Sequence, residues 1–239
     1  MYNPWVKITH WIGTISFLFL VYTGIEILMV HPRLYWGDVG NDLTPALFEL
    51  PISRNYHHNG WTTSQPFFNS THSPVSAGRT YDIFNENGWG RSLHFLSAWV
   101  LVAVGLIYLL SGIYTRHFQR DLLPARKEMS FRSLARDMAD HFKHGMAFVR
   151  GPNYGVLQKL SYCLVLFFLV PTIVLTGLTM SPAVAASHPW LLTIFFGAQS
   201  ARTIHFFCAV LLILFLIVHV VMVIRSGFRK HMRAMTFGS

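Results

Sequence analysis

The chain has 239 residues, of which 52% are hydrophobic and only 12% are charged. Because soluble domains carry about 25% charged residues, this composition excludes an ordinary soluble globular domain and indicates an integral membrane protein. The formal net charge of +9 does not indicate a nucleic-acid-binding protein, since the basic residues cluster between apolar segments, as they do in loops beside a bilayer.

Four continuous apolar stretches are long enough to cross a bilayer, which requires about 20 helical residues. They cover residues 5–30, 93–114, 157–180 and 204–224. Only helices and closed barrels satisfy the backbone in lipid, and these stretches show no alternation of polar and apolar residues. We therefore expect an all-α four-helix transmembrane bundle forming a single domain over 1–239. Pro171 lacks a backbone donor and predicts a kink in the third helix.

The loops differ in charge, and this difference predicts the orientation. Residues 115–155 and the tail after residue 224 are rich in Lys and Arg, whereas loop 31–90 has more acidic than basic residues. Cytoplasmic loops carry the excess of Lys and Arg. We therefore expect a multi-pass protein of the bacterial inner membrane with both termini and 115–155 in the cytoplasm, and with loop 31–90 and the 183–200 connection outside.

Three segments between the spans have distinct patterns. The external loop 31–90 is long enough to be functional; it is either a docking surface for an external partner or a loop that only caps its own helices. Residues 130–149 place apolar side chains three or four apart, which predicts an amphipathic helix on the cytoplasmic membrane surface. Residues 189–198 are apolar but too short to span, which predicts an interfacial or re-entrant helix. No internal repeat stands out.

Four of the 13 histidines lie inside the predicted spans: His10, His94, His205 and His219. Ionisable residues at this depth are rare and are functional by default, although any one of them could simply be hydrogen-bonded to a neighbouring helix. His205 and His219 are separated by 14 positions on one helix, so they share a face and lie about 21 Å apart along its axis.

The predicted topology sorts the four histidines into two pairs. His94 and His205 lie just inside the external ends of their helices, whereas His10 and His219 lie near cytoplasmic ends. Two axial imidazoles per iron at two depths predict two b-type haems. A zinc site would instead need four ligands at one depth, and a proton relay would not need matched pairs. No CxxCH motif is present, which excludes c-type haem.

Cations precede three of these histidines by one helical turn. Lys7, Arg91 and Arg202 each stand three residues before a histidine and share its helix face, so they are candidates for pairing with haem propionates, Arg91 and Arg202 above all. The alternative is that they are cations extending from helix ends to the interface. Cys163 and Cys208 lie in apolar runs and are expected to be buried thiols rather than a disulfide.

These residues resemble the dihaem cytochrome b superfamily, which includes formate dehydrogenase gamma subunits, nickel–iron hydrogenase cytochrome b and bacterial cytochrome b561. The match lies in His10-Trp11, in residues 91–94, and in residues 202–205 with His219. Residues 88–95 and 116–124 are most similar to the thiosulfate reductase cytochrome b branch. The resemblance implies that His94 and His205 ligate the outer haem, and that His10 and His219 ligate the inner one.

The resemblance also implies a function. It indicates a dihaem b-type subunit that transfers electrons across the bilayer between the quinone pool and an external redox protein, either a molybdopterin oxidoreductase or a c-type cytochrome. The chain would then be the electron-transfer subunit of a quinone-linked oxidoreductase; no residues are assigned to quinone. The alternatives are a haem-bearing anchor for a larger complex, a histidine-based proton-carrying transporter, and a self-contained quinone-linked oxidoreductase.

Overall fold

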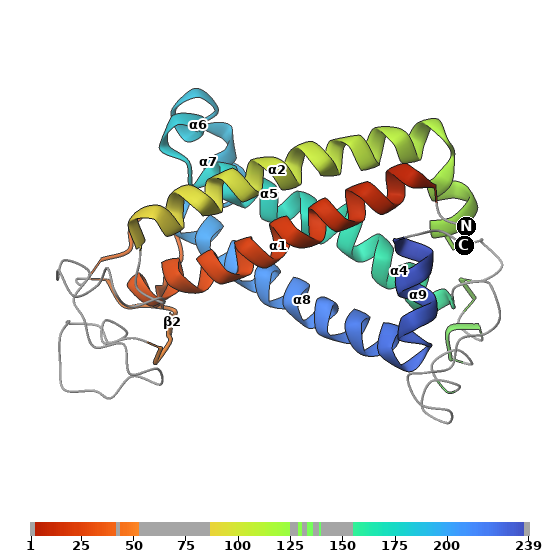
Figure 1. The fold of residues 1–239 in the computed structure, drawn as a ribbon. Coiled ribbons are helices and arrows are strands. Elements are labelled where there is room, and N and C mark those ends of the chain that lie inside the picture. Colours follow the sequence, from red (N-terminus) through yellow and green to blue (C-terminus); the bar gives the residue numbers. More distant parts are fainter. Residues whose placement is uncertain are drawn as a thin grey trace. The chain divides into compact units, whose positions relative to one another are not determined.

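Four long helical segments dominate the computed structural model, which describes residues 3–41, 44–52, 87–124, 129–130, 133–135, 139 and 155–236. Within the described residues, all four are long and apolar enough to cross a membrane, so the expected all-α membrane bundle is confirmed (Figure 1). They are α1 (Pro4–Val30), α2 (Asn87–Tyr114), the third span made of α4 (Val156–Leu164), η3 (Val165–Leu169) and α5 (Val170–Thr179), and α8 (Ala198–Arg225).

The second and fourth spans begin earlier than their apolar runs. The runs were expected to start at residues 93 and 204, but α2 begins at Asn87 and α8 at Ala198. Glycine, arginine and serine lower the hydropathy of a first turn without preventing it from being helical. As a result Arg91 and Arg202 lie inside helical turns, and each shares a helix face with the histidine three residues later.

The third span contains an irregular turn where the sequence predicts a kink. The five residues of η3 form a π-helical turn, and one residue, Val170, separates this turn from Pro171. Proline cannot donate to the carbonyl four residues before it, and π-turns are a recognised way for a helix to absorb an interrupted hydrogen-bond ladder. The predicted disturbance therefore takes the form of a π-turn just before Pro171.

The chain forms two compact units, and α1, α2 and α8 each contribute to both. Unit 1 comprises Met1–Ile12, Ala103–Pro171 and Val210–Ser239, whereas unit 2 comprises Gly13–Val102 and Thr172–Ala209. His10 and His219 both belong to unit 1, and His94 and His205 both belong to unit 2. Each predicted histidine pair therefore lies within a single unit.

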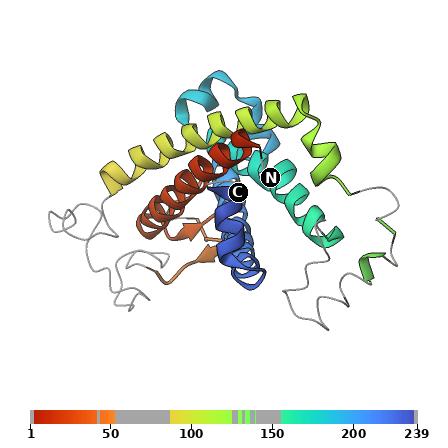
Figure 2. The ribbon, with the colours of Figure 1, turned by 45° about the vertical axis from the view of Figure 1, so that its right-hand side comes forward.

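In unit 2 a short hairpin follows α1 directly. Strand β1 (Arg33–Leu34) pairs antiparallel with β2 (Phe48–Glu49), which Figure 2 shows in orange beside α1. The segment after β1 is tied to the first turns of α8: the hydroxyl of Thr203 donates to the carbonyl of Tyr35 at 2.6 Å, and the amide of Gly37 donates to the hydroxyl of Ser200 at 2.6 Å.

Those contacts bear on the role of the long loop 31–90. Gly37 has a φ of +99°, a left-handed conformation that glycine adopts without strain, and its carbonyl also accepts the amides of Gln199 and Ser200 at 3.0 and 3.2 Å. The described residues 31–41 therefore cap the helices of their own chain. Residues 53–86 lie outside the described residues, so the docking interpretation of that part stays a prediction.

The predicted short element at 189–198 consists of a helical turn and a tight connection. Helix α6 (Pro182–Ser187) precedes α7 (Trp190–Ile194), and Phe196 and Gly197 then adopt φ of +58° and +106° before α8 begins. Trp190 and Ile194 are more than half exposed. Large apolar side chains presented in this way suit the membrane interface.

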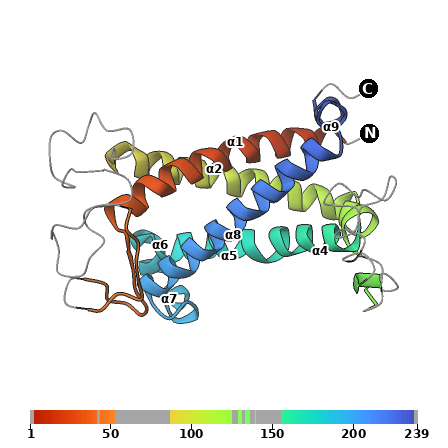
Figure 3. The same ribbon diagram turned by 90° about the horizontal axis from the view of Figure 1, so that it is seen from below.

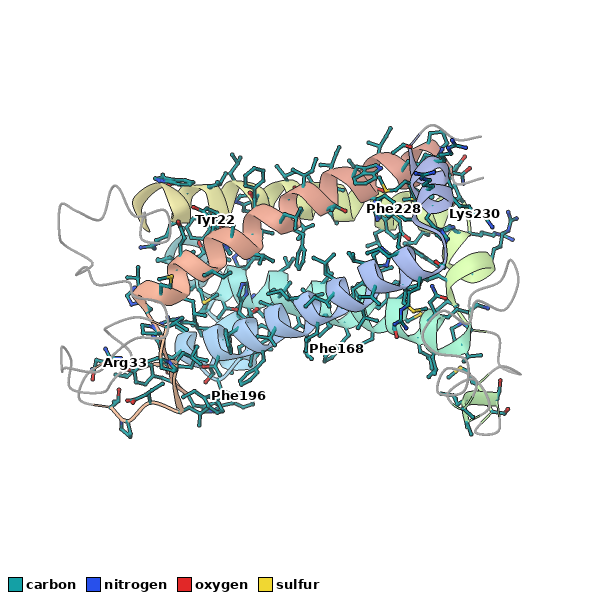
Figure 4. All side chains as sticks on the ribbon, turned by 60° about the horizontal axis from the view of Figure 1, so that its bottom comes forward. Tyr22, Arg33, Phe168, Phe196, Phe228 and Lys230 are labelled. Carbon is teal, nitrogen blue, oxygen red and sulfur yellow. The ribbon has the colours of Figure 1, made fainter. Side chains whose placement is uncertain are left out.

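In unit 1 the chain ends in a basic amphipathic helix, α9 (Phe228–Met235). The indole Nε1–H of Trp11 donates to the carbonyl of Met235 at 3.0 Å, which holds α9 against the start of α1, as Figure 3 shows. Figure 4 labels Phe228 and Lys230 on this helix. The amphipathic helix predicted at 130–149 lies mostly outside the described residues, of which 133–135 are helical.

Candidate metal centres

The histidine pair of unit 2 has the spacing of two ligands on one metal. His94 of α2 and His205 of α8 have ring centroids 6.4 Å apart, with an angle of 53° between the ring planes. Metal–imidazole bonds are about 2 Å long, so two of them in line, together with the distance from each nitrogen to its ring centre, give a centroid separation of about 6 Å. His94 and His205 are therefore separated as two imidazoles that would hold one metal ion between them.

A hydrogen bond fixes which nitrogen of His94 is free to bind a metal. The hydroxyl of Thr23 donates to the carbonyl of Phe19 at 2.7 Å, and its oxygen lies 2.9 Å from Nδ1 of His94. A hydroxyl has a single proton, so when that proton is directed to the carbonyl, Nδ1–H of the histidine donates to the threonine oxygen. The imidazole then carries its proton on Nδ1, and Nε2 keeps the lone pair that a metal needs.

The same arrangement holds His205. The hydroxyl of Thr176 donates to the carbonyl of Thr172 at 2.8 Å, and its oxygen lies 3.1 Å from Nδ1 of His205. By the same argument His205 donates from Nδ1 and leaves Nε2 free. Thr23 and Thr176 are both completely buried.

Each of these threonines is followed by a glycine that lies beside the histidine ring. A Cβ added to Gly24 would lie 3.7 Å from Cε1 of His94, and one added to Gly177 would lie 3.5 Å from Cε1 of His205. The missing side chains therefore leave open the space next to both imidazole edges. Two imidazoles with ring centroids 6.4 Å apart, beside two glycines, make a site whose residues fit a flat prosthetic group such as haem.

Next to this site is a buried acid that the sequence reasoning missed. Glu26 of α1 has no exposed surface, and Gly90 of α2 packs against its carboxylate so closely that a Cβ there would overlap Oε2. Glu26 lies one turn from Thr23 and one turn from Val30. The signal was present in the sequence, since an acidic residue inside a membrane span is a functional candidate by default.

The predicted propionate cations remain predictions, although the structure adds a contact for one of them. The guanidinium of Arg202 donates through Nη2 to the carbonyl of His31, at the end of α1. A guanidinium has five donors, so this bond leaves others for an anion. Arg91 is exposed and Lys7 is half-buried, each one turn before its histidine.

The histidine pair of unit 1 repeats the spacing of the first. His10 of α1 and His219 of α8 have ring centroids 6.4 Å apart, with an angle of 51° between the planes. Phe215 stacks on His219 at 6.0 Å with an angle of 23°, and Trp11 meets His10 edge-on at 5.4 Å. These aromatic rings flank both imidazoles on the same helices that carry them.

Among the described residues no group of three or more His, Cys, Asp or Glu side chains could hold a metal ion. Structural zinc is held by four protein ligands, and the described residues gather no such set. Cys163 and Cys208 are both free thiols, Cys208 buried and Cys163 half-buried.

The sequence pattern of the family described as prokaryotic cytochrome b561 matches residues 1–238. The chain belongs to this family. Membership makes it a multi-pass membrane protein of the haem b type with a role in electron transport, and it confirms the resemblance to the cytochrome b superfamily. It does not by itself fix the number of haems or the residues that hold them.

One curated relative is similar over most of its length. The putative protein-methionine-sulfoxide reductase subunit YedZ1 of Azospira oryzae is 25% identical to this b561-family chain over 223 residues, which is 93% of this chain and 89% of the relative. No solved structure matches the chain.

Proposed function

We propose that this cytochrome b561-family chain binds two b-type haems, one between His94 and His205 and one between His10 and His219, and carries electrons across the membrane. The observation that supports the proposal best is that two separate histidine pairs have the same ring-centroid separation of 6.4 Å. A histidine hydrogen-bonded singly to a neighbouring helix has no reason to adopt a metal-bridging distance to a second histidine, and here that distance occurs twice.

When bound, haem iron supplies one-electron redox chemistry, at a potential set by its ligands and surroundings. The protein's own contribution is to fix the ligands. α1 and α2 each supply one histidine, and α8 supplies one to each pair. Because both axial positions would be filled by imidazole, a substrate could not bind the metal directly, which favours electron relay over chemistry at the iron.

The partners belong to the same proposal. The chain would accept or deliver electrons at the quinone pool and exchange them with an external redox protein, a molybdopterin oxidoreductase or a c-type cytochrome, as the electron-transfer subunit of a quinone-linked oxidoreductase. Support for such a partner comes from the relative, which is described as a subunit of a putative reductase. The basic residues of 115–155 and of α9 support an inner-membrane orientation with both termini in the cytoplasm.

The test is a reduced-minus-oxidised absorbance spectrum with pyridine haemochrome quantification on the purified full-length chain, followed by reduction with quinol. We expect two haems per chain and one haem in each of His10→Ala, His94→Ala, His205→Ala and His219→Ala. His188→Ala is the matched control, since that exposed histidine contacts Ser187 rather than another histidine and should keep both haems.

The rival functions predict different outcomes. A folded wild-type chain without haem, made where haem is available, would contradict the proposal and favour a histidine-based proton carrier. Two haems that quinol does not reduce, in a chain needed only for assembly of a complex, would favour a haem-bearing anchor. Direct reduction of an external substrate by the isolated chain would favour a self-contained oxidoreductase.

A further inference from the structure

We propose that Thr23 and Thr176 are positioning residues for the outer haem: each holds Nδ1–H of one axial histidine and thereby sets the orientation and the donor strength of the ligand nitrogen. The inference rests on the proposed function for the presence of the haem, but the threonine–histidine contacts themselves are features of the chain. It assigns a role to two side chains that belong neither to the ligand set nor to the propionate cations.

The first support is that the same threonine–histidine arrangement occurs twice, on two pairs of helices with similar sequences. Residues 21–25 read Val-Tyr-Thr-Gly-Ile and residues 174–178 read Val-Leu-Thr-Gly-Leu, whereas residues 91–95 read Arg-Ser-Leu-His-Phe and residues 202–206 read Arg-Thr-Ile-His-Phe. The first and second halves of the chain therefore each supply one Thr-Gly helix and one Arg-x-x-His helix. A chance contact would not be expected in both halves with the same atoms.

The second support is the direction of the hydrogen bonds. A threonine inside a helix readily donates to the carbonyl four residues earlier, and both Thr23 and Thr176 do so. That bond commits the hydroxyl proton and turns the oxygen lone pairs outward. The oxygen can then only accept, so it selects the Nδ1–H tautomer of the histidine that faces it and rejects the tautomer with the proton on Nε2.

The third support is burial. Both threonines have no exposed surface, and a polar group that is buried needs a hydrogen-bond partner. Without the threonine oxygen, Nδ1–H of His94 would lose this partner and His205 would keep only its backbone hydrogen bond to Ile173, so either ring could turn away from its ligand orientation. Second partners of metal-bound histidines fix the ring and raise its basicity, and losing one typically weakens metal binding or activity about 10- to 100-fold.

These steps predict the sign of the change in potential. A hydrogen bond donated from Nδ1 puts more electron density on Nε2, and a stronger donor stabilises the oxidised iron. Thr23→Val and Thr176→Val keep the shape of the side chain but remove the acceptor. We expect each to raise the midpoint potential of the outer haem, to leave the inner haem unchanged, and to make loss of the outer haem roughly tenfold faster.

The chain offers a matched control on the same helix. Thr179 of α5 is also buried, at 1% exposure, and its hydroxyl makes the same bond to the carbonyl four residues earlier, Leu175, at 2.8 Å. Its hydrogen bond goes to backbone rather than to a ligand histidine, so Thr179→Val removes the same group from the same environment. Thr23→Ser and Thr176→Ser keep the acceptor and serve as rescue variants.

The experiment is a redox titration, with low-temperature electron paramagnetic resonance of the oxidised haems, on the full-length detergent-solubilised variants. Each variant is also made in combination with His10→Ala, which removes the inner haem, so that only the outer haem contributes to the signal. We expect a higher potential and shifted g-values in both valine variants, and wild-type values in both serine variants and in Thr179→Val. A valine variant too weak to keep the outer haem supports the proposal if its serine counterpart keeps it.

Unchanged potential, g-values and haem loss in the valine variants would overturn the inference, as would an equal shift in Thr179→Val. The proposed function fails separately. If the wild type lacked two haems, or if His94→Ala and His205→Ala removed different haems, the ligand assignment would be wrong whatever the threonine variants did. If the wild type holds two haems, if His94→Ala and His205→Ala lose the same one, and if the valine variants change nothing, only the role of the threonines is refuted.

Discussion

A single methyl group at Gly90 should loosen the helix contact beside the His94–His205 pair. A Cβ there would overlap Oε2 of Glu26 and lie 3.5 Å from its Cδ. Glu26 has no exposed surface, so its carboxylate has no open space to enter, and either that carboxylate or the α1–α2 contact must shift. Overpacking of this kind costs about 1–3 kcal/mol, while replacing a helical glycine by alanine returns up to about 1 kcal/mol.

Taking the middle of the overpacking range, the net expectation for Gly90→Ala is a loss of about 1 kcal/mol, which for a chain of this size corresponds to a fall in Tm of roughly 2–4 °C. Gly105→Ala on the same helix is the control, because a Cβ there meets nothing within 4 Å, and it should be neutral or slightly stabilising. Thermal unfolding of the haem-loaded protein in detergent measures both. Equal Tm values for the two variants would refute the packing argument.

Two further predictions each remove one side-chain hydrogen bond that holds a segment of the chain in place. Trp11→Phe keeps an aromatic ring but removes the Nε1–H that binds the carbonyl of Met235, so we expect faster amide hydrogen exchange in α9; unchanged exchange there would contradict the tether. Thr203→Val removes the buried bond to the carbonyl of Tyr35, worth about 1 kcal/mol, so we expect faster cleavage by trypsin at Arg33, and equal cleavage rates would count against it.

The histidine pairs could be predicted because the sequence alone shows both the residues and their depth in the membrane helices. A histidine in a long apolar run is conspicuous, and helix periodicity together with loop charge gives its depth. The structure places His94 beside His205 and His10 beside His219 at equal separations, as the pairing predicts. The starts of α2 and α8 were harder to predict. Their first turns are helical, but these turns are polar and lie outside the apolar runs.

The threonines could not be predicted in the same way. Threonine is common in membrane helices, and only the structure shows which threonines contact a histidine. Thr23 contacts His94, 71 residues away, and Thr176 contacts His205, 29 residues away. These unequal separations, caused by the long loop 31–90, also hid the repeat of the Thr-Gly and Arg-x-x-His segments. Glu26 is different, since an acidic residue in a membrane span is visible without any structure.

The pairing of ligands across helices is the central claim, and double variants test it most directly. Pyridine haemochrome quantification should give one haem per chain for His94→Ala/His205→Ala, because both substitutions fall on one site, and none for His94→Ala/His219→Ala, because they fall on different sites. If the two double variants kept the same amount of haem, or if the first lost both haems while the second kept one, the assignment of the four histidines to two sites would be contradicted.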